Sequence, residues 1–131
     1  MERSAIQLLQ TLKPELSEEE VGLSFNLGDH IVYTNQHVAT QLGYEKPQEL
    51  CHLHPFMLSP ERQPDGELSS TKSMLMLKKA RVLGEYNFPW VHVKADKSEV
   101  NCHIHLFDLS NRNDSHIEGT DLFAIWQFKV D

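Results

Sequence analysis

Residues 86–107, YNFPWVHVKADKSEVNCHIHLF, decide the fold. Within this stretch, residues 86–93 and 100–107 alternate between apolar and polar side chains, which is the two-residue period of a β-strand. Asp96 lies between the two runs, where a chain reversal is needed. Pro89 has no N–H for a strand ladder, so we expect it at a sheet edge or a bulge. The pattern predicts two long antiparallel strands joined by a tight turn.

Three further β-prone segments extend this sheet. Residues 21–25 and 30–34 flank Leu27-Gly28-Asp29, in which the glycine supplies the positive φ of a hairpin turn. Residues 122–130 form a closing strand. We therefore expect five antiparallel strands.

Helical patterns occupy the rest of the chain. Apolar residues recur at helical spacing in residues 3–13 and again in residues 69–83, where the expected inner face holds Met74, Leu75, Leu77, Ala80 and Leu83. Asn35 is placed to cap a short helix that Gly43 would end, and residues 47–50 form a further helical turn. The prolines and glycine of residues 54–66 predict a loop with short turns. Residues 17–20 fit a linker better than a capping box.

Composition limits the classes of function. The chain has 131 residues and a formal net charge of −7, which suits one α+β domain and disfavours nucleic acid or an anionic membrane as a partner. Neither a membrane-spanning run nor a signal peptide is visible, so we expect a cytoplasmic protein. Cys51 and Cys102 are about fifty residues apart, and we expect both to be reduced.

Four short motifs resemble the PAS family, in its bacterial sensory-box form. Residues 31–35 are similar to the strand of that family that ends in an Asn before a helix. Leu42-Gly43-Tyr44 with residues 47–50 resembles an "LGY…EEL" segment. Residues 56–66 resemble the "SPxxQPDG" loop, and residues 88–96 resemble the "FEWxHxxxDG" strand. The sequence departs from the pattern at Lys97, where a glycine is usual, and this change suggests a different turn type. It also departs at the reduced exit motif Val130-Asp131.

The resemblance implies a PAS-like five-stranded antiparallel sheet with short helices on one face. Residues 1–20 would be an N-terminal helix and linker, and residues 21–131 the sensory domain. It also implies signal transduction, a homodimer and an output domain or signalling partner beyond the chain. The apolar stripe of residues 3–13 is open to two interpretations, since it could cover this sheet or meet a second copy.

Cofactors of the family find little support in the residues. Flavin photosensors carry a reactive cysteine in an Asn-Cys-Arg-Phe-Leu-Gln motif, whereas Asn101-Cys102-His103 lies on a strand. Haem-binding members use a His on the long helix, and residues 69–83 contain none; Met74 and Met76 are better explained by packing. Flavin and haem are therefore not supported by motif, and the cofactor is unknown.

A metal site is the weaker interpretation of the histidines. His103 and His105 share one face of a strand and His92 could lie beside them, an arrangement that zinc could use with a fourth ligand. Ordinary sheet histidines explain the pattern better, so we expect no metal. His52 and His54 fit a loop.

The predicted function is that of a sensor rather than an enzyme. No nucleophile elbow, Walker loop or dinucleotide fingerprint is present, and we expect no catalytic residue. We expect a small-molecule ligand in an apolar pocket, and the residues expected to line it are Val32, Leu42, Phe56, Met74, Leu77, Trp90, Ile104 and Trp126. Two alternatives stay open: a ligand-free dimerisation or docking module anchored on Tyr86, Trp90 and Phe107, and a small cone-shaped isomerase or dehydratase.

Overall fold

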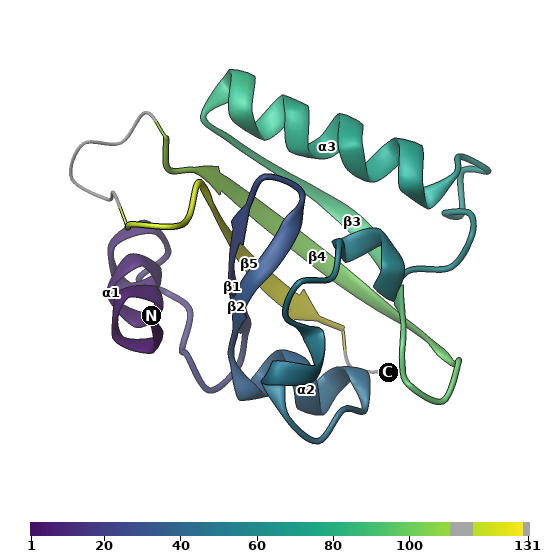
Figure 1. The fold of residues 1–131 in the computed structure, drawn as a ribbon, viewed down its shortest axis with the longest axis horizontal. Coiled ribbons are helices and arrows are strands. Elements are labelled where there is room, and N and C mark those ends of the chain that lie inside the picture. The colour runs from purple at the N-terminus through teal and green to yellow at the C-terminus, as the bar shows by residue number, and fades with distance from the viewer. Residues whose placement is uncertain (111–116, 130–131) are drawn as a thin grey trace.

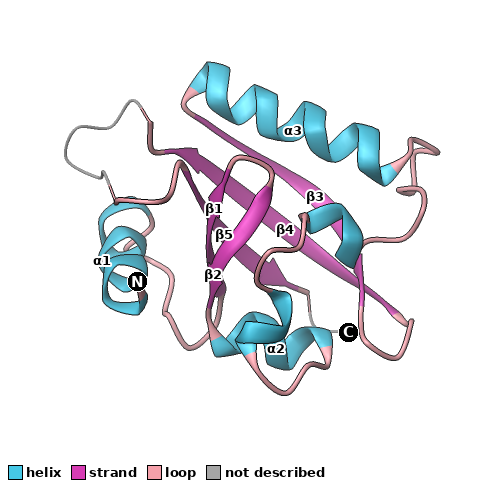
Figure 2. Cartoon of the chain, in the orientation of Figure 1, coloured by secondary structure: helices cyan, strands magenta, loops and turns pink. Residues whose placement is uncertain are grey.

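A five-stranded antiparallel sheet forms the centre of the protein, with strand order β2-β1-β5-β4-β3. The computed structural model describes residues 1–110 and 117–129. Figure 1 and Figure 2 show the sheet with α3 and α2 packed around it and α1 set apart from both. The elements are α1 (Glu2–Leu12), β1 (Gly22–Leu27), β2 (His30–Thr34), α2 (Gln36–Leu42), the 3₁₀ helices η1 (Pro47–Leu50) and η2 (Pro55–Leu58), α3 (Ser69–Leu83), β3 (Glu85–Val93), β4 (Glu99–Asp108) and β5 (Leu122–Phe128).

The long hairpin of β3 and β4 forms as the alternating pattern predicts. Its register pairs Trp90 with Cys102, and β3 is an edge strand, so Pro89 lies at an edge as expected. A different turn type was expected from the lysine at position 97, but the turn between the strands keeps the conformation that glycine favours. Lys97 itself adopts a φ of 76°, in the left-handed region that glycine occupies freely. The turn is held by Asp96, whose side chain accepts hydrogen bonds from Ser98.

The first hairpin and the helix that follows also form as predicted. Gly28 has a φ of 63° and leads the chain from β1 into β2. Asn35 caps α2 by accepting a hydrogen bond from the Val38 amide at 3.3 Å, and its amide donates to the Val21 carbonyl at 3.3 Å. Gly43 ends α2 in the left-handed conformation. Residues 17–20 form turns rather than a helix.

The sheet buries a separate apolar cluster on each face. One cluster packs α2, α3 and the 3₁₀ helices against the sheet, and the other packs Ala5, Leu8 and Leu9 of α1 against it. α1 therefore covers its own sheet, one of the two roles open to its apolar stripe. The closing strand β5 ends at Phe128, and residues 130–131 lie outside the described residues.

The inner face of α3 differs from the expected one. The bounds of the helix are as predicted, but Met74, Leu75 and Leu83 are exposed. The buried residues are Ser69, Ser73, Met76, Leu77 and Ala80. The expectation was wrong because it assumed that polar residues face water, whereas the hydroxyl of Ser69 is hydrogen-bonded inside the protein.

Candidate functional site

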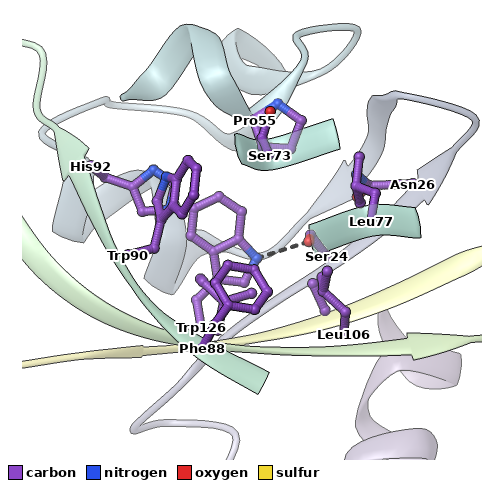
Figure 3. A pocket seen from close by; sticks show the side chains of 12 residues that line it. Ser24, Asn26, Pro55, Ser73, Leu77, Phe88, Trp90, His92, Leu106 and Trp126 are labelled. Carbon is purple, nitrogen blue, oxygen red and sulfur yellow. Dashed lines mark hydrogen bonds between the residues drawn. The ribbon is translucent and has the colours of Figure 1, made fainter. Parts of the chain in front are cut away.

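A small cavity lies between the sheet and α3. Its volume is about 40 Å³, and side chains of β1, β3, β4, β5 and α3 line it (Figure 3). Most of the wall is apolar, formed by Leu77, Phe88, Trp90, Ile104, Leu106, Ala124 and Trp126. One water needs roughly 10–15 Å³ on this measure, so the space suits a molecule of a few non-hydrogen atoms. Drug-sized ligands occupy about 300 Å³ or more, and a haem or flavin would not fit.

His92 is the most unusual polar residue of the wall. It is 1% exposed and its ring stacks on Trp126, with centroids 4.7 Å apart. Nδ1 lies 3.0 Å from the Leu58 carbonyl oxygen, whereas Nε2 is buried without a hydrogen-bond partner. Burial lowers the pKa of His92 to about 4, although the Leu58 hydrogen bond acts in the opposite direction. The ring is therefore neutral at pH 7.

Strand β1 contributes two further polar side chains to the cavity. Asn26 is 2% exposed, and its Oδ1 has no hydrogen-bond partner. Ser24 Oγ accepts a hydrogen bond from Trp126 Nε1 at 2.9 Å, which keeps the hydroxyl hydrogen available. Ser73 of α3 donates to the Ser70 carbonyl. Figure 3 shows His92 and Asn26 toward opposite sides of the group of lining side chains.

The segment before α3 fixes the β3 side of the cavity through four hydrogen bonds. Ser59 Oγ accepts from Trp90 Nε1 at 2.8 Å, and the Leu58 carbonyl holds His92. Gln63 binds the backbone of Val91 at both its N–H and its C=O. These contacts join the "SPxxQPDG" loop to the "FEWxHxxxDG" strand, so the two motifs describe one structural unit.

Half of the predicted pocket residues line this cavity. Leu77, Trp90, Ile104 and Trp126 are brought together, and Leu42 is buried in the same cluster without lining the cavity. The other three residues, Val32, Phe56 and Met74, do not line this cavity. Val32 packs in the cluster beneath α1 because its neighbour Ile31 takes the cavity side; Phe56 lies against His54 in η2; and Met74 is 65% exposed.

The zinc arrangement considered from the sequence does not form. His103 and His105 alternate with Cys102 and Ile104, which lie on the cavity side, so both histidines are on the opposite face from His92. Among residues 1–110 and 117–129, no group of three or more His, Cys, Asp or Glu side chains is placed to hold a metal. Both cysteines are free thiols, and burial raises the pKa of Cys102.

The aromatic anchors considered for a docking module do not form one exposed face, and Tyr86 is partly buried against the cluster on the α3 side of the sheet. Trp90 and Phe107 are 4% and 3% exposed and belong to the clusters on opposite faces of the sheet. They are buried because each face of the sheet is covered by helices.

No helix in the described part of the chain has the length and apolar character needed to cross a bilayer.

Sequence reasoning missed the polar half of the site. Ser24 and Asn26 alternate on β1 with Leu23 and Phe25. This alternation places two polar side chains on one face of the strand and two apolar ones on the other, and it could have indicated the polar residues of the cavity. His92 follows Trp90 at the same two-residue spacing.

Comparison with known proteins gives the fold its name. No family model and no curated protein matches the sequence. Solved structures do match: a PAS domain from Colwellia psychrerythraea is 11% identical, with a TM-score of 0.66 over 93% of this chain and 97% of that chain.

Two further solved structures agree. The PAS domain of an HTR-like protein from Haloarcula marismortui is 18% identical, with a TM-score of 0.63 over 98% of this chain and 100% of that one. The PAS domain of a LuxR-family transcriptional regulator from Burkholderia thailandensis, solved with ethanol, is 14% identical, with a TM-score of 0.61 over 93% and 95%. The strand order and these three likenesses together identify the chain as a domain with the PAS fold.

Proposed function

We propose that the protein is the signal-sensing domain of a bacterial signal-transduction protein and that a small ligand binds in the cavity beneath α3. The observation that carries this proposal is that two residues lining the cavity, His92 and Asn26, each have a buried polar atom without a hydrogen-bond partner, His92 Nε2 and Asn26 Oδ1. An unpaired buried acceptor destabilises a fold by about 1–3 kcal/mol, and a ligand that donates to it removes that penalty. The related domain solved with ethanol supports a ligand of this size.

In this proposal the domain carries no catalytic activity and acts by changing conformation. A ligand shifts a protein between two states only when it binds them with different affinity. An output domain or a signalling partner would respond to that shift, and a homodimer would provide one route for it.

A ligand-free dimerisation or docking module is the second candidate. The exposed apolar side chains of α3 favour it, because Leu75 and Val82 are 49% and 75% exposed one above the other on the outside of the helix. The apolar side of α1 is less suited to a dimer, since Leu8 and Leu9 are buried against the sheet.

Nuclear magnetic resonance with a library of fragments of two to six non-hydrogen atoms tests the proposal. We expect at least one fragment to shift the indole N–H resonance of Trp126 and to saturate. Ser73→Leu, which fills the cavity from α3, should abolish that shift, whereas Thr71→Leu on the exposed side of α3 should not. No response from any fragment, together with a dimer mass in native mass spectrometry, would instead favour the docking module.

A further inference from the structure

The chemistry of the cavity selects among small molecules. Two residues of its wall, His92 and Asn26, each have a buried acceptor atom that lacks a donor. A third group, the Ser24 hydroxyl, has accepted one hydrogen bond and retains its hydrogen for another. An occupant that satisfies the two acceptors must bring a donor of its own, and an occupant that also has an acceptor can bind the Ser24 hydroxyl.

The acceptor character of His92 follows from its hydrogen bond to Leu58. A carbonyl oxygen only accepts, so the ring must carry its proton on Nδ1, 3.0 Å away. Because the buried ring is neutral, Nε2 then holds a lone pair. Stacking on Trp126 fixes the ring in place, so this lone pair is held in one direction.

The cavity disfavours a charged ligand. No Lys, Arg, Asp or Glu is among the residues that line the cavity. A carboxylate or an ammonium would lose its hydration without gaining an ionic partner, which is strongly unfavourable in an apolar site. The volume of about 40 Å³ sets an upper limit of a few non-hydrogen atoms.

From these features, and resting on the proposed function, we infer that the ligand is a small uncharged hydrogen-bond donor, such as a short alcohol or primary amide, whose O–H or N–H binds His92 Nε2 or Asn26 Oδ1. Both kinds of molecule also have an oxygen that can accept a hydrogen bond from the Ser24 hydroxyl. We expect aprotic molecules and anions of the same shape to bind more weakly, because they bring no donor for the two acceptors or lose their hydration.

Three molecules with one shared skeleton test this inference on the wild-type protein. 2-Propanol donates and accepts, acetone only accepts, and acetate carries a charge. The dissociation constants come from titrations that follow the Trp126 indole N–H and the ¹⁵N resonance of His92 Nε2. We expect 2-propanol to bind at least about tenfold more tightly than acetone, the ratio that one unsatisfied buried acceptor gives. Binding of 2-propanol should also move the Nε2 resonance toward the hydrogen-bonded value.

The outcomes separate the inference from the proposed function. Equal binding of acetone or acetate would overturn the inference while leaving a ligand cavity, and absence of binding by all three would overturn both for ligands of this size. As a second readout, Asn26→Leu and His92→Phe remove the two acceptors in turn. We expect the preference for 2-propanol over acetone to fall toward unity in at least one of them, and an unchanged preference in both would contradict the assignment.

Discussion

The side chain of Gln63 pairs with Val91 as a neighbouring strand would. Oε1 accepts from the Val91 N–H at 2.9 Å, and Nε2 donates to the Val91 carbonyl at 3.1 Å. β3 is an edge strand, so these two backbone groups have no ladder partner on the outer side. Gln63 is 4% exposed and also donates to Ser69 Oγ. One amide thus connects the proline-rich loop, the edge strand and the start of α3.

Replacing Gln63 should therefore destabilise the whole domain. We expect Gln63→Leu to lower the free energy of unfolding by about 2–3 kcal/mol, because two buried backbone groups lose their partners. Urea denaturation measures the change. Gln48→Leu, at an exposed position, serves as the control and should change stability by less than about 0.5 kcal/mol. Similar effects for the two variants would argue against this role for the amide.

Acid should destabilise the protein through His92. The ring has a pKa near 6.5 in the unfolded chain and about 4 in the folded protein, so between these values only the unfolded chain binds the proton. The free energy of unfolding must then fall as the pH drops from about 6.5 to 4, by roughly 3 kcal/mol in total. His92→Phe should flatten this slope relative to wild type in urea denaturation at several pH values. Parallel pH profiles for the two proteins would contradict the assignment.

The turn between β3 and β4 can be stabilised by one substitution. Lys97 is exposed with a φ of 76°, a conformation that is strained for residues with a Cβ. We expect Lys97→Gly to raise the free energy of unfolding by about 0.5–1 kcal/mol, measured by thermal or urea denaturation. Lys97→Ala keeps the Cβ and should leave stability nearly unchanged. An equal gain from both would mean that loss of the lysine charge, and not backbone strain, is responsible.

Close packing of α2 on β1 depends on Gly22. A Cβ at this position would overlap Val38 Cγ2 and would lie 3.0 Å from Trp126 Cβ. We expect Gly22→Ala to lower the free energy of unfolding by about 1–3 kcal/mol through this overlap. Val38→Ala removes the overlapping methyl, so the double variant should lose less than the sum of the two single changes. Strict additivity in denaturation experiments would exclude the contact as the cause.

The sequence predicts the elements better than it predicts the site. Strand alternation correctly places Trp90 and Ile104 on one side of the sheet, because the two-residue period of a strand leaves only two choices. Side chains of a helix point in all directions around its axis, so the buried face is harder to predict. In α3, Ser73 is buried whereas Met74 is exposed. The inward serines become understandable only when the fold supplies their partners and the cavity.

The polar groups of the cavity are harder to predict for a related reason. His92 and Asn26 come from β3 and β1, which are not neighbours in the sheet. Their placement around one cavity depends on the order of the strands and on the Leu58 carbonyl, which holds His92. Local sequence patterns carry no information on the order of the strands, so only the resemblance to a known fold could predict which strands lie around the cavity.

Strand β1 connects the two apolar clusters of the sheet directly. Ser24 and Asn26 border the cavity, whereas Leu23 and Phe25 pack with α1 on the other face. Each cavity residue is therefore separated from a residue of the α1 cluster by a single peptide bond. If an occupant of the cavity displaces or twists β1, the surface of Leu23 and Phe25 against which α1 packs moves with it. This movement needs no change in the loops at the edges of the sheet.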